Sequence, residues 1–91
     1  MVTWDLDKAE SNIDKHGIMF SDVEPVFFDP YALTIEDERS EGEERYVTIG
    51  IDVLGRILAV VYTYRANDVR LISARRATRN ERGEYEKGIR P

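Results

Sequence analysis

The side chains best suited to chemistry in this sequence are a single histidine, His16, and a series of lysines and arginines that flank it or follow it far along the chain. Imidazole changes its charge between about pH 5 and 8, which makes His16 the natural candidate for proton transfer. Arginine binds phosphate through two parallel hydrogen bonds. With one histidine and no cysteine, the chain offers no thiolate nucleophile and no two-histidine or zinc–thiolate site.

His16 ends a segment with the spacing of an amphipathic helix. At about 100° per residue, Lys8, Asn12 and Lys15 fall on one polar stripe, and His16 falls between this stripe and the apolar side. The apolar side, which we expect to face the sheet, consists of Leu6, Ala9 and Ile13. His16 would then lie partly buried at the rim of the sheet, where a neutral base is available near neutral pH. In the alternative interpretation, Lys15 and His16 only complement the free carbonyls of the helix end.

Basic residues are concentrated in the second part of the chain. Residues 55–91 hold nine Lys/Arg against four Asp/Glu, a balance of +5, whereas residues 1–54 hold four against fourteen, a balance of −10. The arginines of interest are Arg65, Arg70, Arg75, Arg76, Arg79 and Arg82. The positive balance of residues 55–91 indicates a binding site for a polyanion, but acidic helices that face basic strands would give the same pattern. Because half-buried arginines usually pair with carboxylates, about half of these arginines are expected to be structural.

Strand periodicity predicts how the arginines of residues 69–76 divide between two faces of a sheet. Simple alternation places Arg75 on the face of Leu71, and Arg70 with Arg76 on the other face. Which face also carries the tyrosines of the preceding strand depends on whether the connecting loop has two or three residues, and the sequence leaves this open.

Length and composition exclude several classes of protein. Ninety-one residues form one domain, 1–91, with no second lobe to close on a substrate. The longest apolar run, 57–62, is far shorter than the ~20 residues of a membrane span, and no signal peptide is evident, so we expect a cytoplasmic protein without membrane contact. The acidic segment 36–44 does not have the spacing of an EF-hand loop, and we expect neither a metal ion nor a cofactor.

Capping patterns and hydrophobic periods predict the elements that must position these residues. Three capping boxes predict helices that start at Asp7, Ser21 and Thr78 and cover residues up to about 16, residues 22–28 and residues up to about 87. Apolar patterns predict strands over 32–36, 46–51, 56–65 and 69–76, with a possible short edge strand at 2–4. The order ααββββα predicts an α+β domain with one antiparallel sheet, two N-terminal helices and one C-terminal helix.

Taken together, these residues resemble the BrnT family, small toxins of bacterial type II toxin–antitoxin pairs. Each motif alone is weak, but their order, spacing and the total length are hard to reach by accident. The resemblance covers nearly the whole chain and rests on Trp4-Asp5, Lys8, Asn12, Lys15-His16-Gly17, Phe20, Val26-Phe27, Asp29-Pro30, Gly42-Glu43, Arg45, Gly50, Val60-Val61-Tyr62-Thr63, Arg65, Arg70-Leu71-Ile72-Ser73-Ala74-Arg75, Ala77, Glu81-Arg82 and Tyr85.

The resemblance implies a RelE-like fold and a ribonuclease toxin that stops translation and growth. It also implies a cognate antitoxin of the BrnA type, whose DNA-binding part is a ribbon-helix-helix dimer, so that operator DNA is contacted only through the antitoxin. RNA carries its own nucleophile, the 2′-hydroxyl. A metal-independent enzyme therefore needs only a base, an acid and cations near the phosphorane.

On this hypothesis, His16 transfers protons, Lys8, Lys15 and Arg65 bind the scissile phosphate, and Arg75 acts at the same site or supports it. The flanking RNA backbone is assigned to Arg70, Arg76 and Arg79. One feature departs from RelE-like ribonucleases, which are generally basic, because this chain has a pI of about 4.8. Residues 36–44 would repel RNA unless they lie away from the groove. If they lie near it, we expect the fold with reduced or lost activity.

Two alternatives belong to other classes of protein. One is a non-catalytic protein-binding module of the same fold, which uses its arginines internally. The other is a nucleic-acid mimic that offers its carboxylates to a basic protein. A short downstream reading frame with a ribbon-helix-helix pattern would favour the toxin over both.

Overall fold

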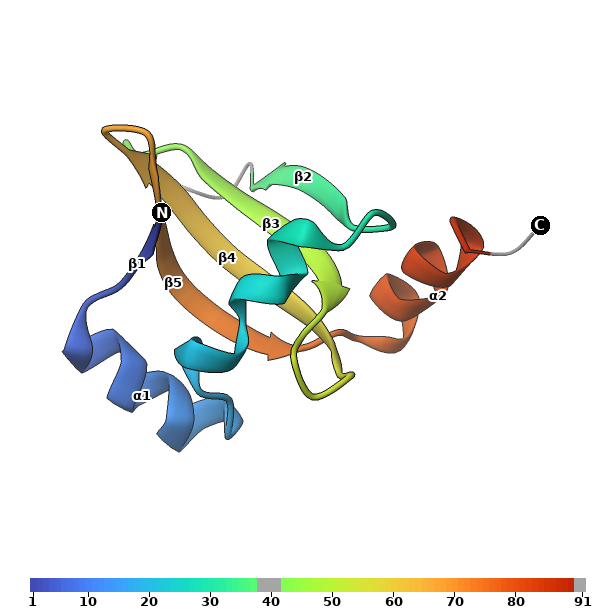
Figure 1. Ribbon diagram of the computed structural model, residues 1–91, viewed down its shortest axis with the longest axis horizontal. Helices are drawn as coiled ribbons and strands as arrows, with labels where there is room; N and C mark the ends of the chain where they lie inside the picture. Colours follow the sequence, from blue (N-terminus) through green and yellow to red (C-terminus); the bar gives the residue numbers. More distant parts are fainter. Residues whose placement is uncertain (38–41, 90–91) are drawn as a thin grey trace.

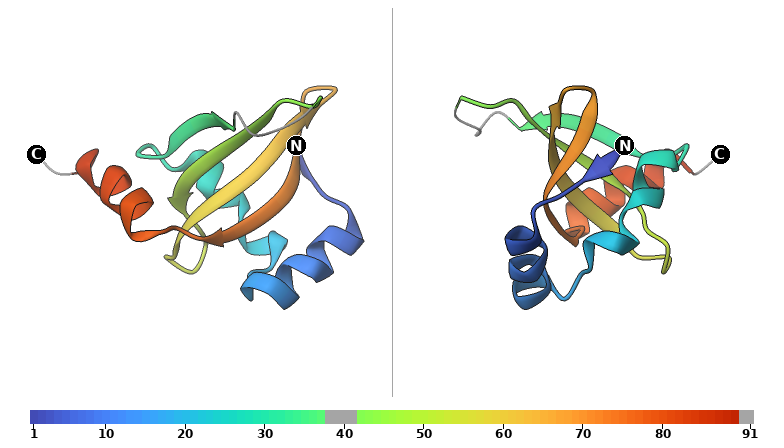
Figure 2. Two further views of the ribbon diagram at one scale, coloured as in Figure 1. Left: turned by 180° about the vertical axis from the view of Figure 1, so that it is seen from behind. Right: turned by 60° about the vertical axis from the view of Figure 1, so that its left-hand side comes forward.

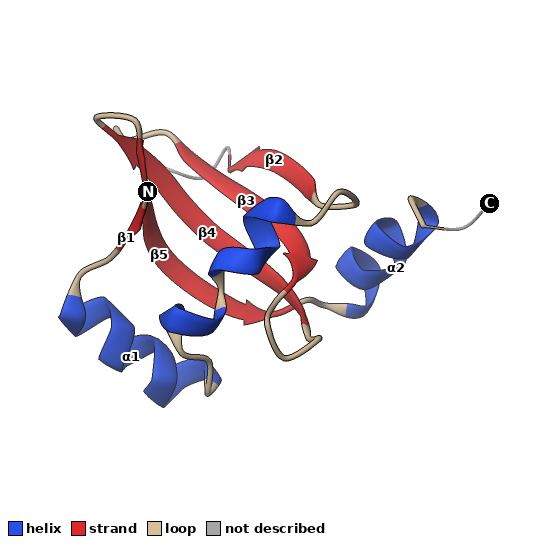
Figure 3. Ribbon diagram, viewed as in Figure 1, coloured by secondary structure: helices blue, strands red, loops and turns tan. Residues whose placement is uncertain are grey.

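A five-stranded sheet forms the centre of the computed structural model, which describes residues 1–37 and 42–89 (Figure 1). The elements are β1 (Val2–Thr3), α1 (Leu6–His16), the 3-10 helices η1 (Phe20–Asp22) and η2 (Glu24–Phe28), β2 (Leu33–Asp37), β3 (Arg45–Ile51), β4 (Ile57–Arg65), β5 (Asp68–Arg76) and α2 (Arg79–Lys87). The expected α+β class is confirmed (Figure 3). Within the described residues, no helix is long and apolar enough to cross a membrane.

The strand order is β1-β5-β4-β3-β2, which puts β4 at the centre as its apolar sequence predicts. The strands from β2 to β5 pair antiparallel, but β1 pairs parallel with β5, Val2 opposite Val69 and Thr3 opposite Arg70. The sheet is therefore mixed, and the expectation of a purely antiparallel sheet is wrong. The parallel pair is possible because residues 4–67 lie between these two strands, so no tight hairpin dictates their direction.

The front face of the sheet, turned to the viewer in Figure 1, is covered by η1 and η2. Val23 and Val26 are completely buried there, in one cluster with Leu58 and Val60 of β4. Gly50 of β3 allows η2 to approach this closely, because an added Cβ would meet the Cγ1 atom of Val26 at 3.0 Å. This layer forms the larger part of the core.

The rear face is covered at one end by α2. Tyr85 of this helix packs in a cluster with Val47, Ile49 and Ala59. Its hydroxyl donates a hydrogen bond of 2.5 Å to Asp29, and burial together with this bond raises the pKa of Tyr85 to about 12. Seen from behind, no helix of the described chain crosses the other end of this face, next to α1 (Figure 2). That end is the region in which the candidate residues gather.

Helix α1 begins earlier than the capping pattern predicts. Asp5 is its N-cap, and the Asp5 side chain accepts a hydrogen bond of 2.8 Å from the N–H of Asp7. Asp7, the predicted cap, lies in the first turn, where the positive end of the helix dipole stabilises its negative charge. The predicted end is confirmed, since Gly17 adopts the left-handed conformation with φ of 68° directly after His16.

The side of α1 that faces the sheet also differs from the prediction. Leu6 and Ile13 are 75% and 45% exposed, so the expectation that they face the sheet is wrong, whereas Ala9 does pack against the front-face core. Asn12 makes the buried contact instead, through three hydrogen bonds to backbone groups. Hydrogen bonds fix the rotation of this helix because buried backbone groups left unpaired are costly.

The second predicted helix, over residues 22–28, is replaced by two 3-10 helices. η1 and η2 are separated at Val23, and neither has a side-chain cap hydrogen bond, so the predicted capping box of Ser21 and Glu24 does not form. Pro25 lies at the start of η2. Proline has no N–H to donate, which disfavours regular α-helical bonding in so short a segment.

The turn between β4 and β5 has two residues, Ala66 and Asn67, both with positive φ. This is the shorter of the two lengths that the sequence left open, and it is the length typical of tight hairpins. Tyr62 and Tyr64 therefore lie on the front face, while Arg70 lies on the rear face.

A β-bulge interrupts β5 and changes the predicted distribution of its side chains. Residues 61–62 of β4 pair with Ser73 and Leu71, which leaves Ile72 without a partner. Leu71 is buried in the front-face core, whereas Arg75 lies on the rear face. The expectation that Arg75 and Leu71 share a face is therefore wrong, because the extra residue shifts the alternation by one position.

Candidate active site

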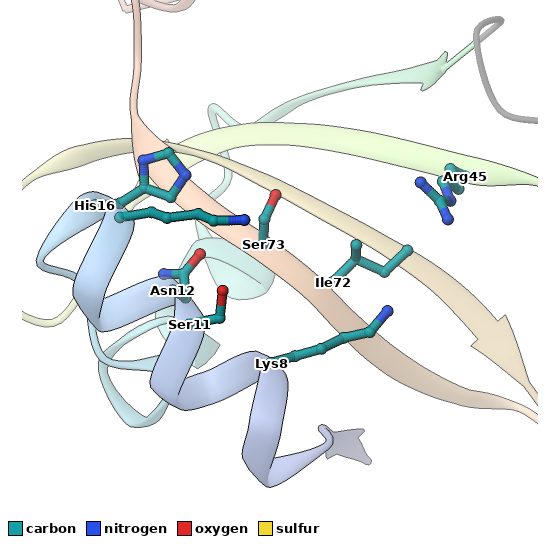
Figure 4. A pocket seen from close by; sticks show the side chains of 8 residues that line it. Lys8, Ser11, Asn12, His16, Arg45, Ile72 and Ser73 are labelled. Carbon is teal, nitrogen blue, oxygen red and sulfur yellow. The ribbon is translucent and has the colours of Figure 1, made fainter.

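A pocket of about 370 Å³ lies between the polar side of α1 and the rear face of the sheet. Its lining comes from α1, β3 and β5 and consists of Lys8, Ser11, Asn12, Lys15, His16, Arg45, Ile72 and Ser73 (Figure 4). The polar stripe predicted on α1 is thus one wall of a pocket, and this lining holds three permanent cations and no carboxylate. Elsewhere in the described chain, too, no group of three or more His, Asp or Glu side chains is placed to hold a metal ion.

His16 is the last residue of α1, and its side chain is exposed. The predicted partial burial is therefore wrong, because His16 is the last residue of the helix and the chain turns away at Gly17 directly after it. The ring nevertheless lines the pocket, and Figure 4 shows it above the part of β5 that carries Ser73. Such an imidazole is within reach of both a bound ligand and solvent, as a group that takes up and releases protons must be.

Asn12 fixes α1, and with it Lys8 and His16, against the edge of β5. It is 3% exposed, and its amide donates hydrogen bonds of 2.9 Å to the carbonyl oxygens of Ile18 and Ala74. Its side-chain oxygen accepts a further bond of 2.9 Å from the N–H of Ala74. Asn12 thus lines the pocket but serves as a structural tie between helix and strand.

Arg45 is the one cation of the described pocket lining that the predicted site omitted; Ser11, Asn12, Ile72 and Ser73 were not predicted as site residues either. It begins β3, and Figure 4 shows its guanidinium on the side of the pocket away from α1. Across the β2–β3 pair it lies opposite Asp37, and its side chain lines the pocket. One signal in the sequence points to it: Arg45 alternates with Val47 and Ile49, which places it on the same side of the strand as these two residues.

Arg65 lies on the rear face but beyond the pocket. Its register partner across the hairpin is Asp68, and its guanidinium is 3.6 Å from a carboxylate oxygen of Glu43. The side chain of Arg65 is 62% exposed. The structure therefore does not bring Arg65 into the lining with His16, although it places both on the same side of the molecule.

Arg75 is held by α2. Its guanidinium donates two hydrogen bonds, of 2.6 and 3.0 Å, to the two carboxylate oxygens of Glu81. Glu81 also completes the predicted capping box with Thr78, which is confirmed at the start of α2. The hydrogen bonds with Glu81 raise the pKa of Arg75 above its usual value. Arg75 is thus one of the expected structural arginines, and it joins β5 to α2 next to the pocket.

The Arg75–Glu81 pair predicts a pH dependence of stability. Hydrogen bonds from Arg75, opposed by burial and aided by Thr78, lower the pKa of Glu81 from 4.5 to about 2. A depressed pKa in the folded state stabilises the protein above pH 4.5, and this contribution is lost as the pH falls towards about 2. Over that window, we expect the wild type to lose roughly 1–2 kcal/mol more unfolding free energy than Glu81→Gln, after allowance for solvent screening.

Urea denaturation between these pH values measures the difference. Glu84→Gln is the matched control, because Glu84 lies on the same helix and is 63% exposed. It should follow the wild-type curve. Parallel curves for the wild type and Glu81→Gln would contradict the assignment.

The three arginines assigned to flanking RNA lie in different places. Arg70 and Arg76, predicted to share a face, lie on opposite faces, with Arg70 opposite Thr63 on the rear and Arg76 opposite Leu58 on the front. Arg76 lines a separate pocket of about 300 Å³ at the other end of the sheet, and Arg79 is an exposed residue at the start of α2. Only Arg70 shares the face of the pocket.

The family model for the ribonuclease toxin BrnT, of type II toxin–antitoxin systems, matches residues 4–81. The chain belongs to the BrnT family. The crystal structure of the Brucella abortus ribonuclease toxin BrnT is similar, with a TM-score of 0.68 and 28% identity, over 86% of this chain and 96% of that chain. No curated protein sequence matches. The matched segment includes every residue of the pocket, and membership implies ribonuclease activity and a cognate antitoxin.

Proposed function

We propose that the pocket cleaves RNA without a metal ion, through attack of the 2′-hydroxyl on the adjacent phosphate. The observation that carries this proposal is that His16 shares a lining with Lys8, Lys15 and Arg45, in the absence of any carboxylate from the described chain. Three cations suit a phosphorane, whose negative charge grows in the transition state. A single imidazole suits the two proton transfers that the reaction requires.

His16 acts first as a base and then as an acid. It takes the proton of the 2′-hydroxyl while the O2′–P bond forms, and it returns a proton to the 5′-oxygen when the P–O5′ bond breaks. The products are a 2′,3′-cyclic phosphate and a 5′-hydroxyl. Lys8, Lys15 and Arg45 stabilise the phosphorane. Arg75 has a supporting role, since its guanidinium is hydrogen-bonded to Glu81.

RNA on either side of the cleaved bond follows the rear face. Arg70 and Arg65 lie on this face and are assigned to the backbone beyond the pocket. Arg76 lies on the front face and Arg79 at the exposed start of α2, so they can contact only an RNA long enough to extend past the rear face. The predicted acidic segment 36–44 lies partly outside the described residues; of its described members, Glu43 pairs with Arg65.

Family membership supports the remaining parts of the proposal. The toxin has a RelE-like fold and cleaves RNA in the cytoplasm, which inhibits translation. Its antitoxin is a ribbon-helix-helix protein of the BrnA type, and the complex contacts operator DNA only through this antitoxin. Growth arrest by the toxin, and its relief when this antitoxin is co-expressed, follow from the proposal.

Cleavage of RNA by the purified protein in the presence of EDTA is the decisive test. We expect full activity, with 2′,3′-cyclic phosphate ends, because the nucleophile belongs to the RNA and the charges belong to the protein. End-labelling distinguishes these ends from the 3′-hydroxyl ends that metal-activated water would leave. Loss of activity in EDTA that Mg²⁺ restores would contradict the proposed mechanism.

A further inference from the structure

The bulge in β5 brings two consecutive side chains, Ile72 and Ser73, into the same pocket. In a regular strand, neighbouring side chains point to opposite faces, so only one of them would line a rear-face pocket. Bulges near active sites often re-aim a side chain in this way. Figure 4 shows both side chains rising from β5 towards the space bounded by α1 and Arg45.

Ile72 is the single apolar member of the described lining, among cations and polar groups. It is half-buried, so part of it faces the pocket. Figure 4 shows the Lys8 side chain extending from α1 towards Ile72, which places a phosphate-binding group next to an apolar surface. An apolar neighbour does not stabilise a bound phosphate, but it does stabilise the face of a bound nucleobase.

Ser73 supplies the second requirement of a base site. Its hydroxyl makes no hydrogen bond with any described residue and is half-buried beside Ile72. A serine hydroxyl both donates and accepts, so it can pair with the edge of a base. The volume of about 370 Å³ falls within the ~300–1,000 Å³ range of small-ligand sites.

We propose that Ile72 and Ser73 form the base-recognition site of this ribonuclease, in which the base of the nucleotide next to the scissile phosphate lies on Ile72 and hydrogen-bonds to Ser73. The proposal rests on the proposed function and adds the determinant of sequence preference. Ile72 contacts every base alike and supplies affinity. Ser73 distinguishes bases by the groups on their edges.

Binding of 2′-O-methyl dinucleotides, which lack the nucleophile, tests the site apart from cleavage. Isothermal titration with the full set of dinucleotides gives a preference at one of the two positions. Ser73→Ala should reduce this preference about three- to tenfold, the effect of one neutral hydrogen bond. Ile72→Ala should weaken all dinucleotides roughly five- to twentyfold by removal of apolar contact. Ser21→Ala and Ile35→Ala, at exposed positions outside the pocket, are the matched controls and should bind as the wild type does.

Sequencing the 5′ ends from a random RNA pool cut by each variant gives the second measurement. The proposal is overturned if dinucleotides bind without any preference, if Ser73→Ala keeps the wild-type preference, or if Ile72→Ala binds as the wild type does. Wild-type cleavage in EDTA with a preference that Ser73→Ala does not change would overturn the base site and leave the proposed function intact. Variant-sensitive binding without any RNA cleavage would support the base site and contradict the proposed function.

Discussion

Replacing His16 with alanine should lower the rate of RNA cleavage by about 10²–10⁴-fold, the range that general acid–base catalysis supplies. The loss should be this large because the chain has one histidine, and the described pocket lining contains no carboxylate to take its place. His16 is exposed and makes none of the hydrogen bonds described for α1, so the variant should fold as the wild type does. Single-turnover cleavage with excess enzyme measures the chemical step directly.

The matched control is Lys87→Ala, which removes a cation from an exposed helix end outside the pocket. It should retain wild-type cleavage, and both variants should give wild-type circular dichroism. In cells, expression of His16→Ala without antitoxin should not arrest growth. A folded His16→Ala variant that still cleaves RNA at more than a tenth of the wild-type rate would contradict the assignment of proton transfer to this residue.

Local patterns in the sequence predicted the parts of the site that one helix contains. Helical spacing placed Lys8, Asn12 and Lys15 on one side, and these residues line one wall of the pocket. Gly17 correctly predicted the helix end that leaves His16 at the mouth. These features depend on residues that are near neighbours in the chain, so the sequence alone carries them.

The features that the sequence did not predict depend on pairing between distant segments. Arg45 shares a pocket with α1 only because β3, β4 and β5 lie side by side. The bulge at Ile72 depends on register against β4, and no turn or glycine signal marks it. Arg75 is bound by Glu81 and does not line the pocket, because α2 packs over the end of the rear face at which Arg75 lies. Charge and periodicity identify such residues as candidates but do not identify their partners.

Asn12→Ala should destabilise the protein by about 3–5 kcal/mol, because it leaves buried backbone groups of Ile18 and Ala74 unpaired. Hydrophobic spacing alone would give Asn12 no such importance, since it predicted that Leu6 and Ile13 hold the helix to the sheet. For a domain of this size the loss corresponds to a Tm lower by at least about 10 °C. Differential scanning calorimetry measures it, and Asp14→Ala, at an exposed position on the same helix, should stay within about 0.5 kcal/mol of the wild type.

Asn12→Asp separates hydrogen bonding from packing, because the two side chains have the same shape. The variant keeps the acceptor for the Ala74 N–H but turns a carboxylate oxygen towards the carbonyl oxygens of Ile18 and Ala74. Burial and these carbonyls disfavour the charged form, so the penalty should be larger at about pH 7 than at about pH 4, where protonation restores one donor. Equal Tm values for Asn12→Asp and the wild type at neutral pH would show that α1 is held by packing alone. Through its three hydrogen bonds, the Asn12 amide holds α1 against β5 and so positions Lys8 and His16 in the pocket. The same side chain therefore stabilises the fold and orders the candidate active site.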